Sequence, residues 1–302
     1  MKGDAGECDA ALSRIDCIQI RGRTFFVKRD DLIDPLLSGN KYRKLYRLMQ
    51  VECGQYQRIV SYGGTQSNAM LSIAALCHQK GWQFHYTCKP VPERLQHHPS
   101  GNLKMALEFG MQLHEVAHDE YEAAILALQS QCDELSLFVP QGGADPMAQQ
   151  GIAVLAQEIS LWRQQNKVEM LYVVTPSGTG TTAFYLAMAL PDATVLTTPA
   201  VGDKDYLLAQ MRRLGAAPAN LKILQRSKKY HFAKPYPELF AIYEELIDAG
   251  IEFDLIYGTL MWRTLLQHID HFEGTILYVH SGGLTGNETM LARYRRQGFI
   301  AS

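Results

Sequence analysis

The chain has 302 residues, 47% hydrophobic and 20% charged, which is enough for one large globular domain or two modest ones. Its formal net charge is -2 and no long run of one sign occurs, so we expect a small-molecule ligand and neither a nucleic acid nor a membrane as partner. The N-terminal stretch "MKGDAGECDAALSRID" lacks the apolar segment of a signal peptide, and no apolar run is long enough to cross a bilayer. We therefore expect a cytoplasmic protein.

The first informative stretch is "LLSGNKYRKLYRLM" at 36–49, a tight turn followed by a predicted helix over 41–49. Helical spacing gives this segment one apolar face, formed by Tyr42, Leu45, Tyr46 and Met49. Lys41 falls in the first turn, where a cation opposes the helix dipole, so a stabilising role is not expected. Two interpretations remain from the residues: a solvated lysine in a basic patch with Arg43 and Lys44, or an amine of low pKa that bonds a carbonyl cofactor.

The next element is "RIVSYGGTQSNAMLSIAALC" at 58–77, an apolar run, a glycine-rich break and a helix-like run. Ser67 and Asn68 stand just before the apolar part of the predicted helix. They suit a helix N-cap, and they equally suit a nest of N–H groups for a carboxylate beside a positioned hydroxyl. The residues alone leave both interpretations open.

Cysteines offer a possible metal site but do not form the usual pattern. The six thiols are spread without a CxxC pair, which fits reduced thiols better than a disulfide framework; they are Cys8, Cys17, Cys53, Cys77, Cys88 and Cys132. Cys77, His78, His85 and Cys88 come closest to a cluster, but they straddle a helix end and the strand predicted in "WQFHYTCK". We expect packed thiols and surface histidines there, and no metal.

A second strand, break and helix occur in "LYVVTPSGTGTTAFYLAMAL" at 171–190. Gly178 and Gly180 free backbone N–H groups just before a helix N-terminus, which favours an anion. Hydroxyls surround them, at Ser177, Thr179, Thr181 and Thr182. The loop reads as a phosphate cradle without a counter-charge, because the P-loop lysine and the dinucleotide glycine pattern are both absent. A Gly/Thr turn that caps an ordinary helix is the alternative.

The third such unit is "TILYVHSGGLTGNETM" at 275–290, with a weaker closing helix. Three strands that each lead through a glycine-rich loop into a helix predict an α/β fold with mainly parallel sheets flanked by helices. In such sheets ligands gather at the carboxyl ends of strands, so we expect the three loops to share one location.

Six segments together resemble a known family. In chain order they are "VKRDDLIDPLLSGNKYRKL", "SYGGTQSNAML", "VPQGGADPMAQQG", "TPSGTGTTA", "FDLIYGTLMW" and "YVHSGGLTG". Their order and spacing are similar to those of the 1-aminocyclopropane-1-carboxylate deaminase and D-cysteine desulfhydrase family. The likeness runs over about residues 12 to 290. These are pyridoxal-phosphate enzymes of fold type II, the tryptophan-synthase β class.

The resemblance implies a role for particular residues. Lys41 matches the Schiff-base lysine, Ser67 the active-site serine and Tyr257 the active-site tyrosine. Asn68 matches the asparagine that bonds the 3′-oxygen of the cofactor, and Ser281 lies where fold type II enzymes often place a hydroxyl against the pyridine nitrogen. The phosphate loop corresponds to Ser177, Gly178, Thr179, Gly180 and Thr181.

Departures from the family pattern bear on the substrate. Members that act on the cyclopropane amino acid typically have Glu where this chain has Gly258 and Leu where it has Ser281. Thr259 is a candidate substitute for the Glu. Phe232 falls about where a second active-site tyrosine is common, although Tyr230 is close enough to serve. Two further positions differ from the usual choice, namely Gln141 and Phe184.

The resemblance implies a homodimer built from two-domain subunits. Residues 1–43 plus 152–302 would form the large cofactor-binding domain, and residues 44–151 a smaller inserted α/β domain. The expected activity is a pyridoxal-phosphate-dependent lyase or deaminase reaction, β-elimination from D-cysteine or a related β-substituted amino acid, which gives an α-keto acid, ammonia and sulfide. The alternatives are a 1-aminocyclopropane-1-carboxylate deaminase and a non-catalytic protein that binds pyridoxal phosphate.

Overall fold

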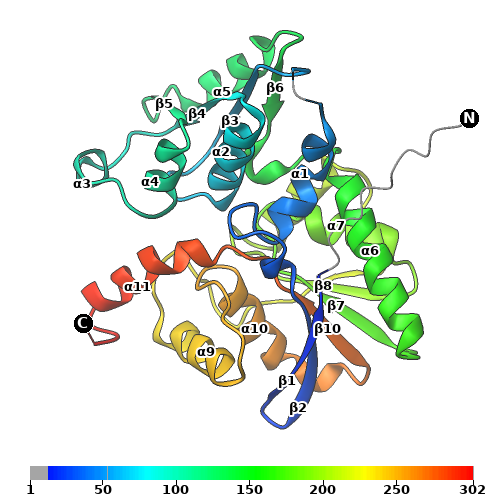
Figure 1. Ribbon diagram of the computed structural model, residues 1–302. Coiled ribbons are helices and arrows are strands. Elements are labelled where there is room, and N and C mark those ends of the chain that lie inside the picture. Colours follow the sequence, from blue (N-terminus) through cyan, green and yellow to red (C-terminus); the bar gives the residue numbers. More distant parts are fainter. Residues whose placement is uncertain (1–12, 53, 302) are drawn as a thin grey trace, which may run out of the picture.

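The computed structural model describes residues 13–52 and 54–301. The described residues do not include Cys8, Cys53 or nearly all of the N-terminal stretch that we compared with a signal peptide. The described chain forms two sheets with helices around each of them (Figure 1). Within this part of the chain, no helix is both long and apolar enough to span a membrane.

The larger sheet has six strands in the order β1-β2-β10-β7-β8-β9. They are β1 (Ile15–Ile20), β2 (Arg23–Lys28), β7 (Leu171–Val174), β8 (Thr194–Thr197), β9 (Leu221–Ile223) and β10 (Thr275–Val279). Strands β1 and β2 form an antiparallel hairpin, and every other pairing is parallel. Helices of this part are α6 (Ala148–Gln165), α7 (Thr181–Ala189), α8 (Lys204–Arg212), α9 (Pro237–Asp248), α10 (Gly258–Gln267) and α11 (Asn287–Arg296).

Both faces of this sheet are buried, which explains its continuous apolar strands. On β10, Leu277 and Val279 pack with α6 and α7, whereas Ile276 and Tyr278 pack with α9 and α10. The alternation follows from the two-residue period of a strand. The core is therefore split into two layers, one on each side of the sheet.

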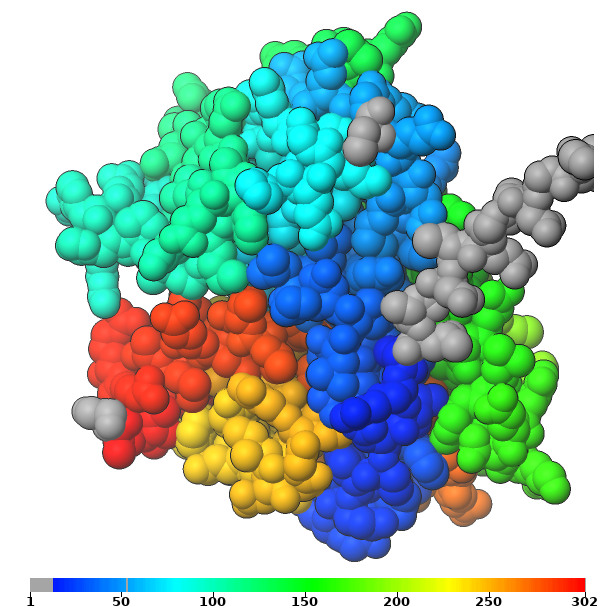
Figure 2. Space-filling view, in the orientation of Figure 1, coloured from blue at the N-terminus to red at the C-terminus, as the bar shows by residue number. Residues whose placement is uncertain are grey.

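The smaller sheet has four strands, all parallel, in the order β5-β4-β3-β6. They are β3 (Arg58–Tyr62), β4 (Gln83–Cys88), β5 (Gln112–Glu115) and β6 (Ser136–Val139). Its helices are α2 (Asn68–Lys80), α3 (Glu93–His97), α4 (Gly101–Glu108) and α5 (Tyr121–Ser130). Figure 2 shows the cyan and teal residues of this part gathered above the yellow and red residues of the larger sheet's part. Helix α1 (Asn40–Gln50) lies between the two sheets in Figure 1 and contacts both α2 and α6.

The predicted α/β architecture with mainly parallel sheets is confirmed. The three strand–loop–helix units are β3 with α2, β7 with α7, and β10 with α11, the last after a short 3-10 turn over Leu284–Gly286. All four strands of the smaller sheet fall within residues 44–151. This location supports the proposed division into two domains. Its boundaries remain a prediction.

The cysteine and histidine cluster is spread over separate environments. Cys77 and Cys88 are each 1% exposed in the core of the smaller sheet. His78 contacts the ring of Phe109, and His85 stacks on His114. Among the described residues, no three His, Cys, Asp or Glu side chains gather in an arrangement that could hold a metal ion.

Candidate functional site

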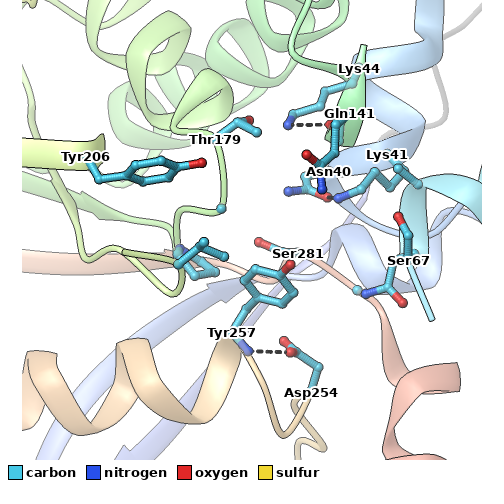
Figure 3. A pocket seen from close by; sticks show the side chains of 17 residues that line it. Asn40, Lys41, Lys44, Ser67, Gln141, Thr179, Tyr206, Asp254, Tyr257 and Ser281 are labelled. Atoms are coloured by element: carbon cyan, nitrogen blue, oxygen red, sulfur yellow. Dashed lines mark hydrogen bonds between the residues drawn. The ribbon is translucent and has the colours of Figure 1, made fainter. Parts of the chain in front are cut away.

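A cavity lies at the carboxyl ends of β3, β7 and β10, where the three glycine-rich loops meet (Figure 3). The first turn of α1 and the segment before α10 complete its wall. Its lining residues include Asn40, Lys41, Lys44, Ser67, Asn68, Gln141, Gly142, Gly178, Thr179, Tyr206, Asp254, Tyr257 and Ser281. The expected shared location of the loops is confirmed, and it brings together residues from both sheets.

The turn before α1 is fixed against the loop after β10. The N–H of Asn40 donates to the carbonyl of Ser281 over 3.2 Å. Gly39 has a φ of +58°, and a Cβ at this position would lie 2.0 Å from the carbonyl carbon of Ser281. Only glycine fits such a close approach, so the Ser-Gly-Asn turn holds Lys41 beside the Ser281 loop.

Lys41 has an amine suited to covalent chemistry. Its Nζ donates to Oδ1 of Asn40 over 2.6 Å, and no carboxylate of the described residues forms an ion pair with it. Burial lowers the pKa of Lys41 to about 8, against a smaller opposing effect from the charge of Asp254. A lysine near this pKa is substantially neutral at mildly alkaline pH, and only the neutral amine is a nucleophile.

The basic-patch interpretation of this helix is wrong, because Arg43 and Lys44 are 0% and 7% exposed. Arg43 donates to the carboxylates of Asp30 and Glu158 at 2.7–3.0 Å. Lys44 instead extends toward the cavity, where its Nζ donates to the carbonyl of Gly142 over 2.9 Å. Burial, followed by the charge of Lys41, lowers the pKa of Lys44 well below its usual range.

The loop before α7 presents unused donors to the cavity. The backbone N–H groups of Gly178, Thr179 and Gly180 have no hydrogen-bond partner within the described ranges, and they precede the N-terminus of α7. Thr181 shares a 3.0 Å hydroxyl contact with Thr179. Ser177 lies behind the loop and does not line the cavity; its hydroxyl contacts that of Thr197 at 2.7 Å.

Lys44 places an amine beside this loop, whose own sequence has no cation. In Figure 3 its amine faces Thr179 across the cavity. Gly142, whose carbonyl Lys44 binds, is also next to Thr179: a Cβ on Gly142 would lie 3.4 Å from the methyl of Thr179. Free N–H groups, a helix N-terminus and one amine, which a bound dianion would keep protonated against the effect of burial, form a site for a doubly charged anion such as a phosphate monoester.

Ser67 caps helix α2 and also lines the cavity. Ser67 is the N-cap of α2, and its hydroxyl accepts from the N–H of Met70 over 3.3 Å. The N-cap interpretation is thus confirmed, and the same side chain lines the cavity with Asn68. The hydroxyl also lies beside Tyr86: burial raises the pKa of Tyr86, and a hydrogen bond with Ser67 opposes that rise.

Tyr257 and Asp254 form a further part of the cavity wall. The carboxylate of Asp254 accepts from the N–H groups of Tyr257 and Gly258 at 2.6 and 2.8 Å and so caps α10. Burial raises the pKa of both Asp254 and Tyr257. The Tyr257 ring lies against Gly178, where a Cβ would be 3.4 Å from a ring carbon. A tyrosine in this setting keeps its proton at neutral pH.

Ser281 carries a buried hydroxyl oxygen that has no hydrogen-bond partner in the described part of the chain. Such atoms are rare, because a buried polar group without a partner is destabilising. This one lines the cavity. A ligand with a ring nitrogen acceptor would satisfy it.

The sequence left undecided whether Tyr230 or Phe232 occupies the place of a second active-site tyrosine. Tyr230 is buried away from the cavity and bonds Glu238 and Arg263, whereas Phe232 is 50% exposed and packs edge-on against Tyr257. Neither lines the cavity, but Tyr206 of α8 does, with its hydroxyl directed inward in Figure 3. No motif marks Tyr206, since it follows an ordinary Asp N-cap at 203.

The sequence matches the family described as "Pyridoxal-phosphate dependent enzyme" over residues 10–277. It is 25% identical to a putative 1-aminocyclopropane-1-carboxylate deaminase of Thermotoga maritima, over 91% of this chain and 92% of that protein. It is 26% identical to a D-cysteine desulfhydrase of Serratia proteamaculans, over 87% of each. A crystal structure of an ACC deaminase homologue superposes with a TM-score of 0.72 at 20% identity, over 93% of each chain.

Proposed function

Because this chain belongs to the family of pyridoxal-phosphate dependent enzymes, we propose that it eliminates the β-substituent of D-cysteine or a related β-substituted amino acid. The products are an α-keto acid and ammonia, with sulfide when the substrate is D-cysteine. The observation that carries this proposal is the unpartnered hydroxyl of Ser281 in a cavity that also holds Lys41. The D-cysteine desulfhydrase of Serratia proteamaculans supports the substrate class.

The residues of the cavity fit pyridoxal phosphate. The N–H groups of residues 178–180 and the amine of Lys44 suit its phosphate, and the Ser281 hydroxyl suits its ring nitrogen. Asn68 suits its 3′-oxygen, as the resemblance implies. Lys41 is the residue that holds the cofactor covalently. When bound, pyridoxal phosphate supplies an electron sink for the bond broken at the α-carbon.

Proton transfer falls to three side chains of the cavity. Lys41 is the base that would remove the proton from the α-carbon of the substrate, which its lowered pKa permits near neutral pH. Ser67 and Tyr257 both line the cavity and are the acids for the departing β-substituent. Tyr257 suits this role because burial keeps it protonated. The N–H groups of the Ser67 loop hold the substrate carboxylate.

A serine at the ring nitrogen favours elimination. A hydroxyl donates a hydrogen bond without a full proton, so the ring withdraws fewer electrons than it would beside a carboxylic acid. Such a ring would supply a weaker electron sink, which would favour loss of the β-substituent. It would disfavour racemisation and transamination, which depend on a stronger sink.

The second candidate activity is deamination of 1-aminocyclopropane-1-carboxylate, to 2-oxobutyrate and ammonia. The likeness to the Thermotoga maritima protein favours it. Gly258 speaks against it: a Cβ there would lie 2.9 Å from Oδ2 of Asp254, so a glutamate side chain would force Asp254 to move. A homodimer in the cytoplasm, with residues 44–151 closing over the ligand, completes the proposal.

The deciding experiment is α-keto acid release by the cofactor-loaded protein, offered D-cysteine, L-cysteine and 1-aminocyclopropane-1-carboxylate in parallel. Pyruvate from D-cysteine alone is the expected result. Release of 2-oxobutyrate from the cyclopropane substrate would favour the second candidate. A Ser281→Leu variant tests the carrying observation, since it should lose pyruvate formation while a Ser160→Leu control on the outer side of α6 keeps it.

A further inference from the structure

Three side-chain amides form a chain next to the cavity, and the structure fixes which way each one faces. Asn102 of α4 is 0% exposed. Its Nδ2 donates to the backbone carbonyl of Gln66 over 3.1 Å and to Oδ1 of Asn68 over 2.8 Å. The N–H of Asn102 donates to Oε1 of Gln66 over 3.0 Å, and Nε2 of Gln66 donates to the carbonyl of Ser100 over 3.0 Å.

The orientation of Asn102 follows from a backbone group that has only one role. The carbonyl of Gln66 accepts and never donates, so the NH₂ end of Asn102 must face it. The same NH₂ end faces Asn68, which must therefore present its oxygen. The NH₂ end of Asn68 is left to point the other way.

Asn68 Nδ2 is available to a ligand. Asn68 is the first residue of α2 and lines the cavity, and its Nδ2 donates to no other group of the described residues. Gly283 leaves room for it, because a Cβ at 283 would lie 2.4 Å from this nitrogen. The neighbour of Asn102, Gly101, has a φ of +57° and packs on Gln66 and Thr289, which holds the start of α4 in place.

This arrangement is kept in spite of an unfavourable feature. Oδ1 of Asn102 is buried and has no partner in the described part of the chain. A buried carbonyl oxygen without a hydrogen bond is destabilising, and this offsets part of what the two hydrogen bonds donated by Asn102 contribute to the fold. Its two donated bonds, one to a fixed backbone carbonyl and one to Asn68, are what an apolar residue would not provide.

We propose that Asn102 is a positioning residue for the cofactor: it sets the amide of Asn68 so that an N–H, and not a carbonyl oxygen, faces the 3′-oxygen of pyridoxal phosphate. The inference rests on the proposed assignment of Asn68 to that oxygen. An N–H favours the anionic form of a phenolic oxygen, whereas a carbonyl oxygen repels it. The orientation of one amide thus controls both the affinity for the cofactor and its protonation.

Asn102→Asp is the sharpest variant because it changes one atom. A carboxylate accepts only, so Asn68 would rotate, donate to Asp and turn its oxygen to the cofactor. We expect the affinity of the apoprotein for pyridoxal phosphate to fall about tenfold, as for one lost hydrogen bond to a charged group. We also expect the absorption of the bound cofactor to titrate at a higher pH. Unchanged affinity and absorption would overturn the proposal.

An Asn68→Ala protein serves as a second background, in which a positioning role of Asn102 can be distinguished from a structural role. In an Asn68→Ala protein, adding Asn102→Asp should leave affinity and absorption where Asn68→Ala alone puts them, because the effect acts through Asn68. A further loss in that background would mean that Asn102 only supports the fold. Where the aspartate variant does not fold, Asn102→Ala takes its place in the same cycle, with a smaller loss of affinity expected and the same dependence on Asn68.

The same variants distinguish an error in the assignment of Asn68 from an error in the role of Asn102. If Asn68→Ala alone leaves the affinity and the absorption of the cofactor unchanged, the assignment of Asn68 is wrong and the inference falls with it. If Asn68→Ala changes both but neither Asn102 variant does, the site assignment stands and only the positioning role is overturned.

Discussion

Helix α1 carries two kinds of buried cation, and their surroundings differ. Arg43 is bonded by Asp30 and Glu158, and Lys28 joins Glu158 at 2.5 Å, so the positive charges here are matched by carboxylates. Lys41 and Lys44 face the cavity, where their amines bond only an amide oxygen and a backbone carbonyl. The positive charges on one side of the helix are balanced by carboxylates, whereas the amines on the other side have no carboxylate partner.

The pKa shifts follow this difference. Burial works against the charge on Arg43, but the hydrogen bonds from Asp30 and Glu158 outweigh it and raise the pKa. For Lys41 and Lys44 burial prevails and lowers the pKa. Removing one member of a buried ion-pair network leaves its partners uncompensated, whereas lysines without a carboxylate partner suit a ligand that brings negative charge. The comparison therefore supports a structural role for Arg43 and agrees with the proposed role of the two lysines in cofactor binding.

Lys41→Ala should produce the largest effect, because it removes the proposed attachment point. After borohydride reduction, mass spectrometry should find one bound cofactor on the wild-type chain and none on the variant. Keto acid release should fall by about a thousandfold or more, as expected when a nucleophile and base are lost together. Lys104→Ala, at an exposed ion pair with Glu108, is the matched control and should retain the label. A labelled Lys41→Ala protein would contradict the assignment.

Arg43→Met tests the structural side of the comparison. The change leaves Asp30 and Glu158 buried without their shared partner, so the free energy of unfolding should fall by about 3–5 kcal/mol. Urea denaturation of the apoprotein measures this loss. Arg14→Met, at an exposed ion pair, should lower it by about 1 kcal/mol at most. If Arg43→Met were as mild as its control, the network would not be a main support of α1.

Lys44→Met tests the cavity side by the same measurements. Removing a buried amine that has no carboxylate partner should change the stability of the apoprotein little, because the lost hydrogen bond to Gly142 is offset by the lost cost of burying the amine. Its affinity for pyridoxal phosphate should fall about tenfold to a hundredfold, as for a charge-assisted hydrogen bond to phosphate. Pyridoxal without its phosphate is the matched ligand and should bind both proteins equally. Equal losses for both ligands would mean that Lys44 shapes the cavity and does not pair with phosphate.

The sequence predicted those parts of the fold that depend on local pattern. Apolar strands, glycine-rich breaks and helix starts occur within about 20 residues of each other, so β3 with α2 and β7 with α7 could be recognised without tertiary information. Because these glycine-rich breaks follow the carboxyl ends of strands, they could also be predicted to lie at a ligand site. The resemblance then pointed to Lys41 and Ser281, which the structure brings into one cavity.

The rest depended on contacts distant in the sequence. Arg43 was open to interpretation as a solvated residue because its partners, Asp30 and Glu158, are 13 and 115 residues away. Lys44 was missed as the phosphate counter-charge because its partner is a carbonyl 98 residues away. No pattern in the sequence identifies a backbone carbonyl as a partner, so only the folded chain reveals it.

The most gradual effect concerns the pH dependence that Lys41 gives to the apoprotein. Its pKa is about 8 in the folded chain against 10.5 ordinarily, so between these pH values the unfolded chain binds a proton that the folded chain lacks. Stability therefore rises with pH across that window, by at most about 1.4 kcal/mol per pH unit. Below pH 8 both states are protonated and the contribution is constant and unfavourable.

Lys41→Met removes this titration, so the difference in unfolding free energy between the two apoproteins isolates it from all other groups. The difference should favour the variant most below pH 8 and shrink toward pH 10.5. A difference that stays flat over this range would mean that Lys41 keeps an ordinary pKa. The unmatched amine would then need the cofactor itself to lower its pKa, and the contrast between the two sides of α1 would rest on Lys44 alone.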